Sequence, residues 1–281
     1  SSFDTRFILE YNVNPPLFPG LIGYTFSAED SSNDAGSSDR AGGILKAVDD
    51  WIADPVAAEY TYGHISTWDT SEITNFNYLF GSPSKTEGYP ARNFNEDLSH
   101  WNVSNVTDMS YMFSNSIAFN SDISNWDVSK VENMELMFAS TESFNSNLNN
   151  WNVSSVTWMN YMFYYAESFN QNLNKWNTYN VTNMSAMFYG CSNFDHPLND
   201  WQTDNVTDMS VIFTYASSFN QPLNPPPNGG WEVGQVTTMN SMFSNASSFN
   251  QDISTWNTSG LSAFGMYDNC PIDPLYKAPN T

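Results

Sequence analysis

The chain has 281 residues, of which 30 are acidic and eight are lysine or arginine, so its formal net charge is −22. Nucleic acids and anionic membrane surfaces are bound by clusters of basic side chains, and this composition excludes both as partners. Aromatic residues make up 16% of the chain, which supplies a core and excludes a disordered acidic protein. No run of about 18 apolar residues occurs, so no membrane-spanning segment is predicted.

Residues 1–38 form an arm and linker that differ in composition from the rest of the chain. Phe7–Tyr11 could form a strand, and Ala28–Asp39 is a linker rich in serine, aspartate and glycine. Two interpretations stay open for this arm. It packs against its own chain, or it adds as a strand to a neighbouring molecule, so that the protein assembles into polymers.

Residues 39–64 are predicted to form an N-terminal capping helix. Ile44, Val48, Trp51 and Ile52 recur at intervals of four, three and one, which places them on one apolar stripe of a helix. Asp39 could accept hydrogen bonds at the start of this helix as its N-cap. Repeat arrays need such atypical ends to cover their terminal faces.

A repeat of mostly 25 residues occupies the chain from residue 65 to residue 267, and residues 268–281 follow it as a tail. Eight tryptophans mark the repeat: Trp68, Trp101, Trp126, Trp151, Trp176, Trp201, Trp231 and Trp256. Two intervals are longer, because insertions occur at Gly81–Arg92 and at Pro225–Gly230. Self-similarity at this period is typical of a solenoid, in which each unit packs only on its neighbours.

Within one repeat, the spacing of apolar residues predicts a strand followed by a helix. Leu98, Trp101 and Val103 have the spacing of a leucine-rich-repeat strand, whereas Val106 begins a stripe at intervals of three and four. The predicted fold is therefore an α/β leucine-rich-repeat-like solenoid of eight rungs, each with a short parallel strand, a turn and a short helix. The repeated tryptophan, valine, methionine and phenylalanine columns are interpreted as core.

The segment Phe144–Thr157, followed by Met159 and Met162-Phe163, resembles the BspA-like leucine-rich repeat family. That family is also catalogued as a domain of unknown function first noted in mycoplasmas. The resemblance extends over the repeat region. It implies a secreted or cell-surface protein that is linked to adhesion or binding, and it implies no catalytic residues.

The two cysteines, Cys191 and Cys270, are predicted to be free thiols. Each follows a methionine of the repeat by four residues, where other repeats have alanine. They therefore lie three repeats apart, roughly 14 Å at the spacing of adjacent strands. A disulfide needs Cα atoms within about 7 Å, so no bridge is expected.

Eight asparagines begin an Asn-x-Ser/Thr sequence, the acceptor pattern of N-glycosylation. They are Asn102, Asn105, Asn152, Asn180, Asn183, Asn205, Asn245 and Asn257. Two interpretations stay open here. Some of these asparagines carry glycans, or the acceptor pattern occurs only because the repeat happens to contain these residue types in this order.

No motif of a catalytic or metal centre is found. The sequence lacks a glycine-rich phosphate loop, a Gly-x-Ser-x-Gly elbow and the paired histidine or cysteine spacing of zinc sites. No cofactor and no enzymatic activity are therefore expected. The polar column after each tryptophan offers aspartate and asparagine oxygens, which could bind Ca²⁺ weakly.

One group of residues departs from the repeat and is the candidate binding site. In the middle repeats, positions that are small or polar elsewhere become aromatic: Trp158, Tyr161, Tyr164, Tyr165, Tyr189 and Tyr215. Because equivalent positions lie one repeat apart, these side chains are expected to form one patch. Exposed tyrosine and tryptophan are favoured in contact surfaces. The alternative is that the rings only cover neighbouring repeats.

The leading hypothesis is a non-catalytic extracellular binding or adhesion module with a protein or glycan partner. A second hypothesis is a structural subunit that self-assembles through its N-terminal arm or its solenoid ends. A third is an ancillary domain of an enzyme.

Overall fold

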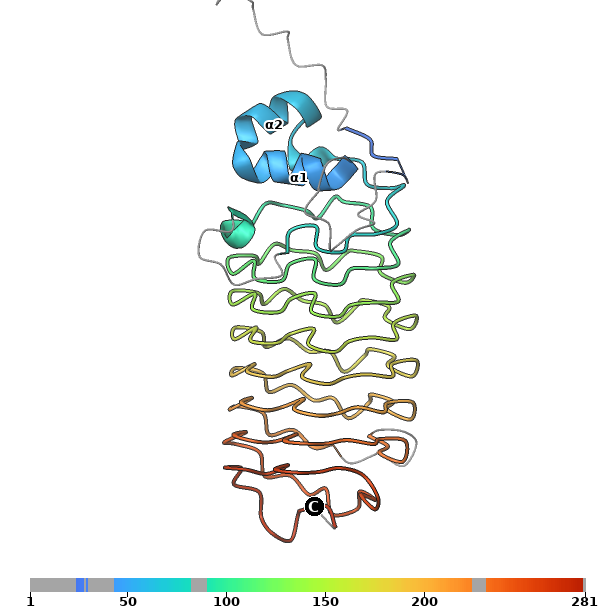
Figure 1. The fold of residues 1–281 in the computed structure, drawn as a ribbon, viewed down its shortest axis with the longest axis vertical. Helices are drawn as coiled ribbons and strands as arrows, with labels where there is room; N and C mark the ends of the chain where they lie inside the picture. Colours follow the sequence, from blue (N-terminus) through green and yellow to red (C-terminus); the bar gives the residue numbers. More distant parts are fainter. Residues whose placement is uncertain (1–23, 28, 30–42, 82–89, 224–230, 280–281) are drawn as a thin grey trace, which may run out of the picture.

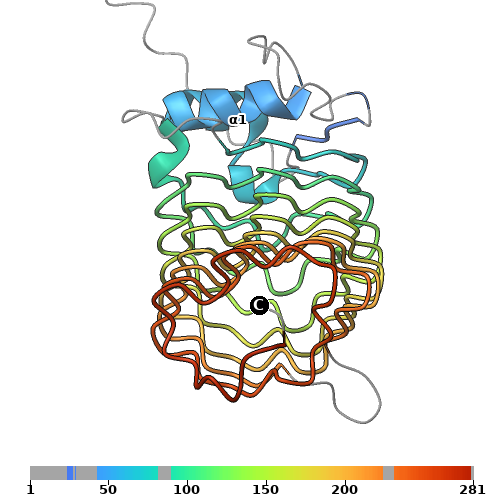
Figure 2. The same cartoon turned by 60° about the horizontal axis from the view of Figure 1, so that its bottom comes forward.

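The repeats stack along one axis, with two helices at one end and the C-terminal residues at the other (Figure 1). The structure is a computed structural model that describes residues 24–27, 29, 43–81, 90–223 and 231–279. Each repeat makes one closed turn around the axis, which we call a coil. Seen obliquely, successive coils follow nearly the same outline (Figure 2). Equivalent residues of successive repeats therefore form columns along the stack.

Two helices cover the first coil, where the sequence predicted one. Helix α1 spans Gly43–Ala53 and buries Ile44, Val48 and Trp51. Helix α2 spans Pro55–Tyr62. Its N-cap is Asp54, whose side chain accepts hydrogen bonds from the backbone N–H groups of the first helical turn. Asp54 has an extended backbone, which breaks the predicted single helix in two. The predicted N-cap Asp39 lies outside the described residues.

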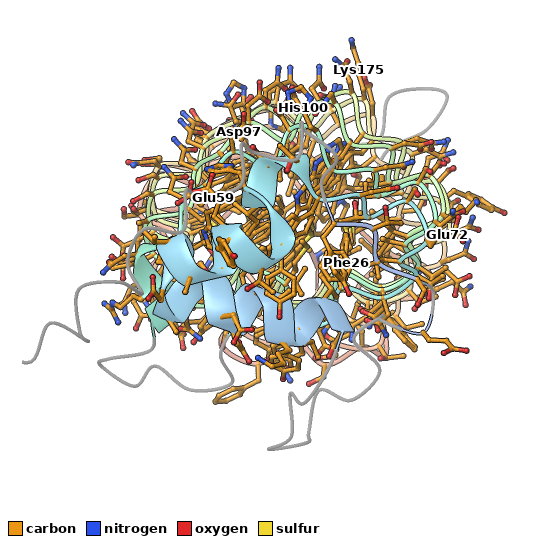
Figure 3. All side chains as sticks on the ribbon, turned by 90° about the horizontal axis from the view of Figure 1, so that it is seen from above. Phe26, Glu59, Glu72, Asp97, His100 and Lys175 are labelled. Atoms are coloured by element: carbon orange, nitrogen blue, oxygen red, sulfur yellow. The ribbon has the colours of Figure 1, made fainter. Side chains whose placement is uncertain are left out.

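A short part of the N-terminal arm is described, and it pairs with the protein's own first coil. The N–H of Phe26 donates to the carbonyl of Asp69, and the N–H of Asp69 donates to the carbonyl of Tyr24. The side chain of Phe26 is buried against Trp68. In the view along the axis, Phe26 lies toward the middle, while polar atoms rim the outside (Figure 3).

The predicted α/β architecture is wrong. In the described part of the chain, the helical elements are α1, α2 and two 3-10 helices, η3 (Ile65–Thr67) and η4 (Pro90–Asn93), all before the second coil. Within the described ranges, the coils contain neither the predicted strand nor the predicted helix, and the strand-like pairing between them is limited to isolated parallel bridges, such as Asp108 with Asn133 and Asn133 with Trp158.

Consecutive reverse turns explain the spacing that resembled a helix. The N–H of Met112 donates to the carbonyl of Met109, and the N–H of Ser116 donates to the carbonyl of Phe113. Each such turn closes over three residues, so apolar side chains at its two ends are three apart. A three-residue interval is therefore shared by a helix face and by a series of turns. The sequence pattern did not distinguish them.

Each coil from the second onward also contains two residues with positive φ. In the second coil these are Tyr111, with φ 59°, and Asn115, with φ 65°. Each is the third residue of one of these turns, which is the position where a type II turn requires positive φ. The equivalent residues in other coils include Leu136, Tyr161, Ala186 and Val211, so glycine is often absent where it would be favoured.

Backbone hydrogen bonds join each coil to the next at alternate residues. The N–H of Tyr111 donates to the carbonyl of Glu135 at 2.8 Å, and the N–H of Phe113 donates to that of Met137 at 2.9 Å. The same pattern recurs in the following coils. These bonds pair backbone groups that would otherwise be buried without partners, and they fix the register of the columns.

The core consists of aromatic columns with parallel rings. Trp126 and Trp151 have ring centroids 6.4 Å apart and an interplanar angle of 6°. The indole Nε1 of Trp126 donates to the carbonyl of Leu98 in the preceding coil at 3.0 Å. Phe138 and Phe163 stack in the same way, with ring centroids 5.7 Å apart. Each ring is thus held by the coils on both sides.

An asparagine column lines the turn that closes each repeat. The Oδ1 of Asn95 accepts from the N–H of Asn120 at 2.8 Å, and Asn120 accepts from Asn145 at 2.8 Å. Asn250 accepts from Asp273 at 2.7 Å, so the predicted tail continues this column. Each asparagine side chain of this column therefore joins its own coil to the next one.

Candidate functional site

Five tyrosines gather on one side of three successive coils, and we call them the tyrosine cluster: Tyr161, Tyr164, Tyr165, Tyr189 and Tyr215. Tyr164 and Tyr189 are stacked, with ring centroids 4.9 Å apart. Tyr165 lies 5.3 Å from Tyr189, and Tyr215 lies 5.6 Å from it. Tyr161 contacts Tyr164 at 5.6 Å. The structure thus brings together five of the six aromatic residues of the predicted patch.

The turns of the coils position these rings. Tyr164 and Tyr189 occupy the same column, one coil apart, directly after the buried Phe163 and Phe188. Tyr165 and Tyr215 occupy the next column, which has positive φ. Gly190 occupies that column between them, and the ring of Tyr165 lies over it. The cluster therefore depends on the register of the coils.

The cluster combines exposed and half-buried tyrosines. Tyr215 is 47% exposed and Tyr161 is 36% exposed. Partial burial raises the pKa of Tyr189 to about 12, and the neighbouring Tyr165 hydroxyl adds to this effect. Burial also raises the pKa of Tyr164. Both phenols are therefore neutral at physiological pH and can donate a hydrogen bond.

Trp158 lies on the same coil as Tyr161, but its ring does not contact a ring of the cluster. It is 51% exposed, whereas the other nine tryptophans are buried. In the column of Trp158, the neighbouring coils have Asn133 and Asn183, and each accepts a hydrogen bond from the N–H two residues later. Trp158 cannot accept such a bond. The sixth residue of the predicted patch is therefore an exposed ring beside the cluster.

The sequence prediction missed further aromatic residues on the coils. Tyr78 and Tyr111 lie in the same column as Tyr161 and stack on each other, with ring centroids 4.2 Å apart. Tyr179 is 51% exposed and stands where neighbouring coils have Ser154 and Asp204. The signal was present at Tyr179, because it replaces a small or polar residue of its column, whereas the column of Tyr78 and Tyr111 also carries Leu136 and Val211.

The aspartates on the outside of the coils form hydrogen bonds within their own turns. The Oδ1 of Asp122 accepts from the N–H of Ser124 at 3.0 Å, and that of Asp127 accepts from Ser129 at 3.1 Å. The serine hydroxyl and N–H lower the pKa of both carboxyl groups. Among the described residues, no group of three histidine, cysteine, aspartate or glutamate side chains is arranged to hold a metal ion. Weak Ca²⁺ binding stays a prediction.

The two thiols differ in their surroundings. Cys191 is completely buried, and its Sγ donates to the carbonyl of Phe163 at 2.8 Å. Burial raises the pKa of this thiol far above its usual range. Cys270 is half-buried, and burial raises its pKa as well. Neither thiol is in a disulfide.

The predicted sequon asparagines all lie on the outer side of the coils, with different hydrogen bonds. Asn102, Asn152 and Asn257 follow a buried tryptophan and are exposed. Asn105, Asn180 and Asn205 donate their side-chain amide to the preceding coil. Asn183 and Asn245 are half-buried.

None of the helices in the described part of the chain has the length and apolar character needed to cross a bilayer.

Comparison with known proteins gives one family and no individual relative. No curated protein and no solved structure matches this chain. A family model described as "Mycoplasma protein of unknown function, DUF285" matches residues 84–181 and again residues 171–271. The two matches together cover more than half of the 281 residues and lie on the stacked coils. The chain belongs to this family of proteins of unknown function.

Proposed function

We propose that this protein is a non-catalytic binding or adhesion module, secreted or on a cell surface, that contacts a protein or glycan partner through the tyrosine cluster and Trp158. The observation that carries the proposal is the contiguous set of tyrosine rings across three coils, of which Tyr161 and Tyr215 are exposed and the other three are half-buried. Tyrosine and tryptophan give large contact area at a small cost in conformational entropy. Their rings also stack on sugars.

The backbone at these positions supports a role other than stability. Tyr161, Tyr165 and Tyr215 have φ between 53° and 59°. A side chain other than glycine costs about 1–2 kcal/mol in this conformation, and asparagine is the best tolerated. The column of Tyr165 and Tyr215 carries asparagine at Asn115 and Asn245. A bulky tyrosine there is a less stable choice, which favours a function in contacts.

Trp158 supports the same conclusion. Its column provides a hydrogen-bond acceptor in the neighbouring coils, through Asn133 and Asn183. Replacing this acceptor by a half-exposed indole loses a hydrogen bond worth about 0.5–1.5 kcal/mol and exposes apolar surface. Neither change stabilises the coil.

The net charge and the family resemblance limit the chemical classes of partner that are expected. With a net charge of −22, the protein repels acidic ligands, so a neutral glycan or a basic protein surface is favoured. The repeat also resembles BspA-like repeat proteins, for which surface location and adhesion are expected.

The test uses substitutions that restore the residue found elsewhere in the same column. Trp158→Asn and Tyr215→Asn are expected to leave the fold intact, because Asn183 and Asn245 already occupy equivalent positions. Tyr179→Ser is the matched control, because Tyr179 is equally exposed but lies outside the cluster. Each variant is applied to an array of neutral oligosaccharides and to a library of basic peptides.

Binding in either array that falls at least tenfold in both cluster variants, but not in the control, supports the proposal. Trp158 fluorescence gives a second readout, since it is the exposed tryptophan and its emission should change on binding. Absence of binding in both arrays, or binding that is equal in the cluster variants and the control, would overturn it.

A second candidate function is self-assembly through the C-terminal end of the stack. Phe264 is 84% exposed, although its column is polar in the preceding coils, at Ser210 and Asn240. The backbone N–H groups of Ala263 and Gly265 make no hydrogen bond within the described residues, whereas the equivalent N–H groups of the preceding coil, at Met239 and Ser241, donate to the coil of Phe264. A second copy could accept hydrogen bonds from Ala263 and Gly265. Loss of concentration-dependent association in Phe264→Ser, measured by light scattering, would favour this candidate.

A further inference from the structure

Five of the eight sequon asparagines are exposed, and in three of these five the side chain is held by a hydrogen bond within its own turn. Asn102, Asn152 and Asn257 each follow a core tryptophan. Their Oδ1 atoms accept from the N–H of the serine two residues later, at 3.1, 3.2 and 3.2 Å. The Nδ2 atoms of these three asparagines form no hydrogen bond within the part of the chain that the structure describes. The reactive nitrogen is therefore presented to solvent.

In three other sequons, the asparagine Nδ2 donates a hydrogen bond that joins two coils. The Nδ2 of Asn105 donates to the carbonyl of Ser71 at 2.8 Å. Asn180 donates to Ser154 at 2.7 Å, and Asn205 donates to Tyr179 at 2.7 Å. Each bond reaches the preceding coil. A substituent on this nitrogen would replace a donor and would have to enter the space between two coils.

The hydroxyl groups of these two sets of sequons also differ. In the second set, the Thr107 hydroxyl donates to the carbonyl of Thr74 at 3.3 Å, and those of Thr182 and Thr207 donate to the preceding coil at 3.2 Å. Among the described residues, none of the serine hydroxyls of the first set donates to the preceding coil. At one site of this set, the Ser104 hydroxyl donates to the Oδ1 of its own Asn102 at 2.7 Å, which polarises the amide of Asn102.

We infer that Asn102, Asn152 and Asn257 are acceptor sites for N-linked glycans on the folded protein, and that Asn105, Asn180 and Asn205 are closed to this modification. The inference is independent of the ligand proposed for the tyrosine cluster. The hydrogen bonds of the structure divide the sequons into sets, whereas the sequence pattern does not distinguish among the eight.

The modification is a group transfer from a polyprenyl-pyrophosphate-linked oligosaccharide, catalysed by an oligosaccharyltransferase. The asparagine Nδ2 attacks the anomeric carbon of the donor sugar, and the bond from that carbon to the pyrophosphate oxygen breaks with its electron pair. The nitrogen loses one proton to a base of the transferase. The products are the glycosylated asparagine and the free polyprenyl pyrophosphate.

The two sets of sequons provide their own control. The middle residue is valine at Asn102 and Asn152 and also at Asn105, Asn180 and Asn205. The sets differ in the hydroxyl residue, which is serine in the first set and threonine in the second. Peptides with the same sequons, free of the coil, lack the inter-coil hydrogen bonds. They show how well the transferase accepts each local sequence.

The experiment treats the full-length, folded protein, made without glycans, with a purified oligosaccharyltransferase and a lipid-linked oligosaccharide. Mass spectrometry of peptides then maps the modified asparagines. Glycans are expected at Asn102, Asn152 and Asn257 and are expected to be at least tenfold less abundant at Asn105, Asn180 and Asn205. The unfolded peptides are expected to be modified in both sets. Asn102→Gln should remove its own signal and leave the others unchanged.

Equal modification of both sets on the folded protein would overturn the inference. So would modification of the threonine set alone, or no modification of the folded protein when the free peptides react. Circular dichroism before and after the reaction verifies that the protein stays folded, so that opening of the coils does not produce the result.

Discussion

The ring of Tyr165 lies directly over the backbone of Gly190 in the next coil. A Cβ atom at Gly190 would come within 2.6 Å of the Tyr165 Cδ1, much closer than van der Waals contact. Other coils have asparagine, serine or tyrosine in the column of Gly190, all with positive φ. Glycine is therefore required at this coil by the neighbouring ring, and not by the backbone conformation alone.

Gly190→Ala is expected to destabilise the protein by about 2 kcal/mol, because it adds a clash to the strain of a positive φ. The free energy of unfolding in urea measures the effect. Gly260→Ala is the matched control, because Gly260 also has positive φ, 85°, and nothing lies within 4 Å of a Cβ built there. In Tyr165→Ser/Gly190→Ala the clash is absent, and part of the lost stability should return. An equal loss in Gly190→Ala and Gly260→Ala would contradict the assigned contact.

Val211 has φ 53°, which is an unfavourable backbone conformation for a β-branched residue. Val211→Asn is expected to stabilise the protein by about 1 kcal/mol, since asparagine is better tolerated there and Val211 is only half-buried. Thermal unfolding should shift upward by roughly 2–4 °C. Leu275→Asn, at an exposed position outside the positive-φ residues, should give no such gain. A decrease for Val211→Asn would show that its side-chain contacts outweigh the strain.

Much of the architecture follows from the sequence alone. The tryptophan interval defines each coil, and the single column that contains Asn120 and Asn145 is visible as an asparagine that recurs with the repeat. The secondary structure was predicted wrongly because Met109, Met112 and Phe113 have a spacing that suits both a helix and a pair of turns. Glycine would have marked the turns, but Tyr111 occupies a positive-φ position instead. Local sequence therefore did not reveal the conformation that inter-coil hydrogen bonds impose.

The candidate patch was predicted only in part, because the repeat period places residues in columns but does not give the direction of each side chain. Columns place Tyr164 above Tyr189, so their proximity follows from the period. The separation of Trp158 from the ring cluster does not follow, because it depends on which way each turn directs its side chain. Tyr78 and Tyr111 were missed because their column varies between coils, with Leu136 and Val211 among its members, so a tyrosine there does not stand out.

Four aspartates on the outer turns should make stability depend on pH. Asp97, Asp122, Asp127 and Asp252 have pKa values lowered below 3.8 by hydrogen bonds from the serine two residues later. A carboxyl group with a lower pKa in the folded state contributes stability above its unfolded pKa. That contribution is lost as the pH falls through the folded pKa. The effect therefore lies below about pH 4.

Replacing these four aspartates by asparagine should reduce the loss of stability on acidification. Asparagine keeps the acceptor, as Asn147 shows by accepting from the N–H of Asn149 at 3.0 Å. The urea midpoint is compared at about pH 5 and about pH 3 for the wild type and the fourfold variant. The midpoint of the wild type should fall further. If the two proteins respond to acid equally, the lowered pKa values are not a source of stability.

Cys191 and Cys270 should differ strongly in reactivity in the folded protein. The thiolate is the reacting species, and the pKa of Cys191 is raised by complete burial, which also blocks access. Cys270 is only half-buried, so it should react first with a thiol reagent at neutral pH. We expect labelling of Cys270 to be at least tenfold faster than labelling of Cys191, and the rates to converge in denaturant. Peptide mapping over time measures both rates, and recovery of a disulfide-linked Cys191–Cys270 peptide from native protein would contradict the register of the coils.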